Sequence, residues 1–144
     1  MFRSVLCPVD PAERGPEAPA LANAKRMVEA SGGKLTLLAV IPDTPGMAAE
    51  YLPSDFRETQ WKDAQAALAD MAQSLALPAG TVATKVRYGR PYHEILEEAG
   101  EAKSDLIVMA SHKPSFSTYL IGSNAAHVVR HAKCSVLVLR PEAA

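Results

Sequence analysis

The chain has 144 residues, of which 48% are hydrophobic and 22% are charged, and its formal net charge is −1. This length fits one domain with a sizeable core, and the composition disfavours disorder. The near-neutral charge gives no electrostatic reason to expect nucleic-acid binding. No apolar run approaches the ~20 residues that a membrane span needs, and the N-terminus lacks a signal-peptide layout. We therefore expect a soluble cytoplasmic protein.

Five short apolar segments alternate with helical patterns along the chain. The first segment is ended by Asp10-Pro11. The second is almost wholly apolar, which is typical of a parallel strand covered on both faces. The expected strands are residues 2–9, 34–41, 81–88, 106–110 and 135–139.

Four helical patterns separate these strands. Pro16 and Pro19 mark the first turn of the first helix, and Gly32-Gly33 ends it. A long connection over 42–53 precedes the second helix. The apolar positions expected to face the core, helix by helix, are Leu21, Ala24, Met27 and Val28; Trp61, Ala64, Leu68, Met71 and Leu75; Tyr92, Ile95, Leu96 and Ala99; and Ala125, Val128, Val129 and Ala132. We interpret the acidic residues, including Glu97 and Glu98, as solvated helix surface.

Alternating strands and helices predict a single α/β domain over residues 1–144, with a parallel sheet wrapped by helices on both faces. In such sheets, ligands bind outside the carboxyl ends of the strands, where the winding direction reverses. With a flavodoxin-like or related strand order, this crevice brings Val9 and Asp10 opposite Ala110, Ser111 and His112.

The segment over 106–131 runs from a buried strand through a polar loop to a helix that opens at Gly122-Ser123-Asn124. Free N–H groups and the positive end of the helix dipole favour an anion at such a helix start. Gly122 lets the backbone approach a phosphate closely, and Ser123 or Asn124 can donate to phosphate oxygens. The alternative is that Ser123 or Asn124 simply caps the helix, with no ligand bound.

Further groups suit a nucleotide. Asp10 can accept hydrogen bonds from ribose hydroxyls or assist Mg²⁺, or it can simply form an Asx-type turn before Pro11. Val9 and Val40 can flank an adenine ring while a backbone group of the second strand reads its edge; the alternative is that both belong to the core. Lys113 can approach a γ-phosphate as a point charge.

The histidines give weaker signals. Ser111 and His112 are neighbours, but no G-x-S-x-G turn surrounds them, so we interpret His112 as a polar loop residue. His127 and His131 have a spacing that can ligate metal, but a solvated helix face explains them better.

Other chemistry finds little support in the sequence. Cys7 and Cys134 are interpreted as small buried hydrophobes, because a disulfide framework or zinc site needs more cysteines or closer spacing. The chain has no G-x-x-x-x-G-K-[ST] motif and no carboxylate pair marked out for acid–base work. Nothing in the sequence argues positively for catalysis.

Together these segments give the chain a resemblance to the universal stress protein family, small α/β proteins that often bind ATP. The resemblance covers essentially the whole chain and is carried by residues 5–10, 37–40 and 89–91, and most specifically by residues 105–109, Gly122-Ser123 and residues 128–140. ATP-binding members carry a G-x2-G-x9-G-[ST] loop. Here Ala110 stands at the first glycine and Lys113 at the second, with eight residues between Lys113 and Gly122.

The resemblance implies a Rossmann-like sheet of strand order 3-2-1-4-5, as in adenine-nucleotide alpha hydrolase-like folds, and ATP as ligand, with or without Mg²⁺. It also implies a homodimer through the edge of the last strand, with Val136 and Val138 on one side of that strand and Leu137 and Leu139 on the other. The strand residues expected at this interface are Ser135, Val136, Leu137, Val138 and Leu139. The expected nucleotide-binding residues are Pro8, Val9, Asp10, Val40, Met109, Ala110, Ser111, His112, Lys113, Gly122, Ser123 and Asn124.

Three functions follow as hypotheses. The first is an ATP-binding sensor or regulatory module of a stress response, without obligatory hydrolysis because no general base is apparent. The second is a dimeric interaction module of the same fold that has lost nucleotide binding. This hypothesis is supported by Ala110 and Lys113, which stand at the two glycine positions of the ATP-binding loop. The third is a slow ATPase, or a protein that phosphorylates itself at Ser111, Ser115 or Ser117.

Overall fold

The computed structural model describes residues 1–12, 14–43, 50–111 and 122–140 of the chain. Within them, strands and helices alternate as expected. In chain order they are β1 (Ser4–Pro8), α1 (Arg14–Ser31), β2 (Lys34–Ile41), α3 (Phe56–Ser74), β3 (Val82–Tyr88), α4 (Pro91–Glu101), β4 (Leu106–Ala110), α5 (Ser123–His131) and β5 (Ser135–Leu139).

All five strands pair in parallel, in the order β3-β2-β1-β4-β5. This confirms the predicted fold class and strand order. The chain moves outward from β1 to β3, then returns to place β4 on the other side of β1. The winding direction therefore reverses between β1 and β4, and the carboxyl ends of these two strands flank the expected crevice.

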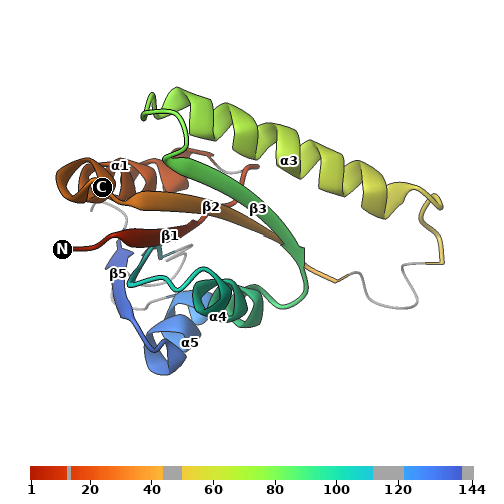
Figure 1. Ribbon diagram of the computed structural model, residues 1–144. Helices are drawn as coiled ribbons and strands as arrows, with labels where there is room; N and C mark the ends of the chain where they lie inside the picture. The colour runs from red at the N-terminus through yellow and green to blue at the C-terminus, as the bar shows by residue number, and fades with distance from the viewer. Residues whose placement is uncertain (13, 44–49, 112–121, 141–144) are drawn as a thin grey trace.

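Helices cover both faces of the sheet, with α1 and α3 on one face and α4 and α5 on the other (Figure 1). Side chains alternate along each strand, so β2 sends Leu35 and Leu37 toward α1 and α3, and Leu38 and Val40 toward α4 and α5. The two resulting cores hold both faces of β1, β2 and β4, which is why these strands are almost wholly apolar.

Local signals explain the ends of the elements. Gly32 adopts a φ of +71° directly after α1, as expected of a glycine that ends a helix. The first strand is shorter than predicted, running over Ser4–Pro8 only. The prediction that Val129 faces the core is wrong, because this residue is 49% exposed.

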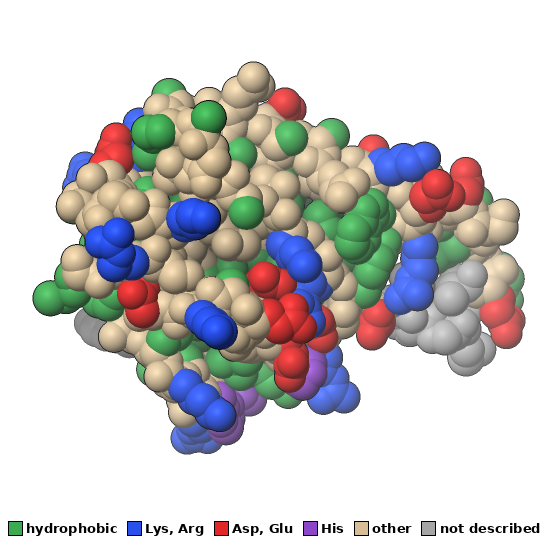
Figure 2. Space-filling model, in the orientation of Figure 1, with side chains coloured by type: hydrophobic (Ala, Val, Ile, Leu, Met, Phe, Trp, Pro, Cys, Tyr) green, Lys and Arg blue, Asp and Glu red, His purple; other side chains and the backbone are tan. Residues whose placement is uncertain are grey.

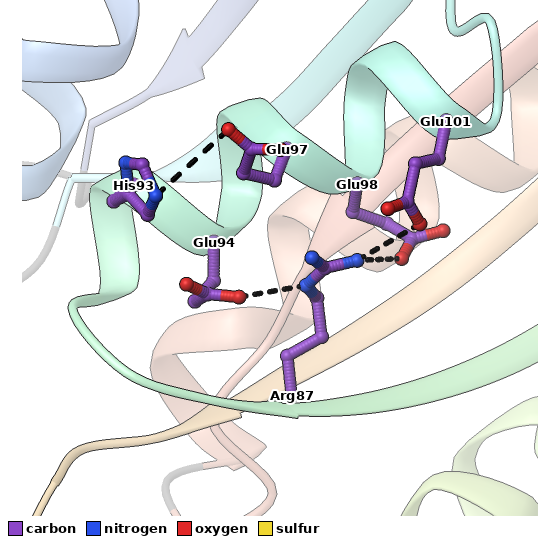
Figure 3. Close-up of polar contacts among 6 residues, drawn as sticks. All are labelled: Arg87, His93, Glu94, Glu97, Glu98 and Glu101. Carbon is purple, nitrogen blue, oxygen red and sulfur yellow. Dashed lines mark hydrogen bonds and ion pairs between the residues drawn. The ribbon is translucent and has the colours of Figure 1, made fainter.

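The expectation that Glu98 is solvated helix surface is also wrong. Glu98 is buried against the sheet, where its Oε1 accepts a hydrogen bond from Arg87 Nη1 at 2.9 Å (Figure 3). Arg87 also donates from Nε to Glu94 at 2.8 Å and from Nη1 to Glu101 at 3.1 Å. One guanidinium on β3 therefore holds three carboxylates of α4, which we call the Arg87 cluster.

The Arg87 guanidinium stays charged. Its hydrogen bond to Glu94 raises the pKa of Arg87, partial burial acts in the opposite direction, and Glu98 and Glu101 raise the pKa further. Red carboxylates gather beside α4 on the surface in Figure 2, and the three partners of Arg87 belong to that helix. The cluster thus joins α4 to the edge strand β3.

The two cysteines differ in burial. Cys7 is fully buried in the middle of β1, and burial raises the pKa of its thiol, with the nearby charge of Glu17 adding to the effect. It is a small buried hydrophobe, as predicted. Cys134 is only partly buried, and its thiol is free.

Among the helices that the structure describes, none is long and apolar enough to cross a membrane.

Candidate functional site

A cleft of about 460 Å³ opens at the carboxyl ends of β1, β2 and β4. This volume lies in the range of small-molecule and cofactor sites, about 300–1,000 Å³. The strand ends and the turn after β1 contribute Pro8, Val9, Asp10, Pro11, Leu38, Ala39, Val40, Ile41, Pro42, Met109 and Ala110, and the helices contribute Glu17, Gln60, Ala64, Pro91, Ile95 and Asn124. The cleft lies where the sheet reverses its winding.

Most of the predicted site residues that the structure describes meet in this cleft. Those that line it are Pro8, Val9, Asp10, Val40, Met109, Ala110 and Asn124. Ser111, Gly122 and Ser123 follow or precede lining residues in the chain but do not line the cleft themselves. His112 and Lys113 lie outside the described residues, as do Ser115 and Ser117.

Asp10 forms the turn that was one of its two expected roles. The Ala12 N–H donates to Asp10 Oδ1 at 2.9 Å, and the Asp10 N–H donates to Glu17 Oε1 at 3.2 Å. Asp10 is nevertheless exposed and lines the cleft. Its Oδ2 has no hydrogen-bond partner in the described part of the chain. The turn therefore fixes the carboxylate and leaves one oxygen for a ligand.

The main chain of Val40 presents a hydrogen-bonding pair to the cleft. Val9 N–H donates to Leu38 O at 2.8 Å, and Gly89 N–H donates to Ile41 O at 3.0 Å. Main-chain groups alternate sides along a strand, so Val40 N–H and C=O point to the side of β1. The β1–β2 register ends at Pro8 and Leu38.

Pro11 explains why this ladder stops. The next donor to Val40 C=O would be the residue two after Val9, and proline has no N–H. No hydrogen bond to the main chain of Val40 is recorded from the turn that follows β1, within the part of the chain described. The C=O of Val40 is therefore left open by Pro11, and the N–H of Val40 is left open because no hydrogen bond joins it to Val9 O in the described part of the chain.

The start of α5 supplies free N–H groups. Gly122 is its N-cap residue, with φ −57° and ψ 152°, and Gly122 O accepts from Ala126 N–H at 2.9 Å. Ser123 and Asn124 are thus the first two helical residues, and the prediction that one of them caps the helix is wrong. The N–H groups of the first helical turn lack intrahelical acceptors, so they can receive an anion.

Ser111 joins the two ends of the segment that links β4 to α5. Its N–H donates to Leu139 O at 2.8 Å, and its Oγ accepts from Gly122 N–H at 3.1 Å. Ser111 is buried, with 6% of its surface exposed. The hydroxyl therefore holds the start of α5 beside the end of β4.

The walls of the cleft include residues that sequence reasoning missed. Gln60 and Ala64 line it from α3, and Pro91 and Ile95 line it from α4. The spacing of four in each pair places its members on one helix face, which is the signal available in the sequence. The spacing alone does not predict that α3 and α4 extend far enough for these residues to line the cleft.

The paired histidines of α5 lie away from this cleft. His127 stacks on Tyr92 of α4 with ring centroids 4.4 Å apart, and His131 stacks on His127 at 6.3 Å. Both histidines are exposed, as predicted for a solvated helix face.

This geometry defines a class of protein: a doubly wound α/β protein with a cleft of the size of a small-molecule site at its switch point. The model of the universal stress protein family matches residues 1–140. The chain belongs to the universal stress protein family.

Individual relatives agree with this assignment. Universal stress protein G of Shigella flexneri is 32% identical over 143 residues, covering 97% of this chain and all of the relative. The solved structure of universal stress protein UspA from Lactobacillus plantarum is 28% identical, with a TM-score of 0.72 and coverage of 96% of this chain and 98% of that one. A universal stress protein solved in complex with cAMP shares the fold, with a TM-score of 0.70, 21% identity and coverage of 98% and 99% of the two chains.

Proposed function

We propose that this protein is an ATP-binding regulatory module of a cytoplasmic stress response. The observation that carries the proposal is that the N–H and C=O of Val40 are open, among the described residues, in a cleft with a mostly apolar lining. An adenine ring offers the complementary edge, with an acceptor at N1 and a donor at N6. A relative of the same fold was solved with cAMP, another adenine nucleotide, which supports this choice of base.

The remaining groups suit the rest of the nucleotide. Val9 and Val40 contact the two faces of the base, and Asp10 Oδ2 accepts from a ribose hydroxyl or binds Mg²⁺, for which carboxylate oxygen is a preferred ligand. The phosphates extend toward the first turn of α5, at Ser123 and Asn124. Ala110, where ATP-binding relatives carry glycine, adds one methyl to the floor of the cleft.

The proposal concerns binding, because the described residues offer no group placed to activate water. Exposed Asp10 is already fixed in its turn, and Ser111 is buried. The nucleotide then acts as a signal that changes which surface the protein presents. A dimeric interaction module without nucleotide is the alternative. The outer edge of β5, which pairs with no strand among the described residues, favours dimerisation in either case.

Identification of the small molecules released from freshly purified protein tests the assignment of the cleft. We expect an adenine nucleotide in the acid extract, identified by mass spectrometry. A ligand of another chemical class, released in stoichiometric amount, would contradict the proposed base.

We also propose a homodimer through β5. This strand pairs with β4 along one edge, and Leu137 and Leu139 pack on the opposite side from Val136 and Val138. Leu139 O accepts from Ser111 N–H, so the main-chain groups of Val136 and Val138 point to the other edge. An apolar edge strand of this kind is protected when it pairs with a second copy.

The variant Val138→Pro should convert the dimer to a monomer. Proline removes one N–H from the outer edge while leaving the hydrogen bonds to β4 in place. Val138→Ala is the matched control, because it loses the same packing but keeps the N–H, and it should remain dimeric. Sedimentation velocity distinguishes the two outcomes, and a Val138→Pro variant that stays dimeric would exclude this edge as the interface.

A further inference from the structure

Gln60 is a polar residue of the cleft lining whose side-chain amide has no hydrogen-bond partner among the described residues. It lies on α3 and lines the cleft together with Ala64, one turn further along the helix. The structure records no hydrogen bond from the Gln60 side chain to any described residue. Ligand pockets are mostly apolar, and their few polar groups orient what they bind.

The helix that carries Gln60 is held in place on both sides of it. Trp61 stacks on Tyr88, with ring centroids 5.6 Å apart, and Arg57 lies over the same ring at 4.7 Å. Tyr88 also donates its hydroxyl to Arg57 O at 2.7 Å. Because Tyr88 ends β3, which pairs with β2 beside the cleft, these contacts fix the height of Gln60 above the strand ends.

We propose that Gln60 is a specificity-determining residue that reads the N6/N7 edge of an adenine base; this inference rests on the proposed nucleotide function. The side-chain amide donates to N7 and accepts from the N6 amino group, a bidentate arrangement that suits adenine. Val40 takes the other hydrogen of N6 and the acceptor N1, so the two groups do not compete. Guanine offers acceptors at both O6 and N7 and cannot satisfy the Gln60 oxygen.

The test combines an atom change in the ligand with a residue change in the protein. 7-Deaza-ATP lacks the N7 acceptor but keeps N6, the ribose and the phosphates. We expect the wild-type protein to bind ATP about 5- to 10-fold more tightly than 7-deaza-ATP, the ordinary worth of one neutral hydrogen bond. In Gln60→Leu, this ratio should fall to about one. Gln65→Leu, an exposed glutamine on the same helix, is the matched control and should keep the wild-type ratio.

Calorimetric titrations of the three proteins with the two nucleotides separate the possible outcomes. A wild-type protein that binds both nucleotides equally, or a Gln60→Leu variant that keeps the preference for ATP, overturns the role of Gln60 and leaves the nucleotide function standing. A wild-type protein that binds neither nucleotide overturns both.

Discussion

Replacing Arg87 by methionine should lower the free energy of unfolding by about 3 kcal/mol. The Arg87 side chain is only 18% exposed, and that of Glu98 is 7% exposed. Removing the guanidinium leaves Glu94 and Glu98 without their common cation in a site from which water is largely excluded. Breaking such a pair costs more than an intact pair contributes, because the remaining charge stays desolvated. Glu101 adds little to this cost, since its side chain is mostly exposed.

Urea denaturation monitored by circular dichroism measures this loss. Lys62→Met is the matched control, because Lys62 and Glu58 form an exposed pair on α3 with side chains 70% and 68% exposed. That pair should contribute only about 0.3–0.5 kcal/mol. Equal losses in the two variants would show that the Arg87 cluster is no more than a surface network.

The variant Ser123→Glu, which places a carboxylate at the start of α5, should bind ATP about 100-fold more weakly than the wild-type protein. A charge about 5 Å from one phosphate charge costs roughly 3 kcal/mol at an effective dielectric constant near 20. The fold should not suffer, because Ser123 is exposed and a negative charge in the first turn of a helix is favourable. Ser123→Glu should therefore lower ATP affinity without lowering the stability of the fold.

Ser123→Gln is the control for side-chain size, and it should retain affinity within a few-fold of the wild type. Gly122→Val is a second variant at the same place. The φ of −57° at Gly122 permits valine, so the loss we expect there comes from crowding of the phosphates. ATP affinity preserved in both Ser123→Glu and Gly122→Val would rule out this helix start as the phosphate site.

The alternation of strands and helices, and with it a parallel sheet, was predictable from the sequence pattern, whereas the strand order that brings Val9, Val40 and Ala110 together came from the resemblance to the universal stress protein family. Buried parallel strands are continuous apolar runs, and their carboxyl ends are marked by the first polar residues that follow. Asp10 is found in the same way. Once the strand order is known, the positions of Val9, Asp10, Val40 and Ala110 follow from it, without knowledge of side-chain contacts.

The sequence-based predictions fail where a residue's environment is set by contacts with residues distant in the chain. Glu97 and Glu98 are adjacent in the chain, but Glu97 is exposed beside His93 of its own helix, whereas buried Glu98 pairs with Arg87 of β3. Gln60 enters the cleft because Tyr88 holds α3 there, which periodicity alone cannot express. Gly122, and not Ser123, is the N-cap residue, and its N–H donates to Ser111 Oγ, which lies 11 residues earlier in the chain.

Calorimetric titration of the wild-type protein with ATP, with and without Mg²⁺, tests the central claim most directly. The open edge of Val40 and the free N–H groups of α5 predict saturable binding of one ATP per chain, with a dissociation constant in the micromolar range. Adenosine should bind more weakly, because it lacks the phosphates. The absence of any saturable binding of ATP by protein first freed of bound nucleotide, with or without the cation, would contradict the account and leave the cleft without its proposed ligand.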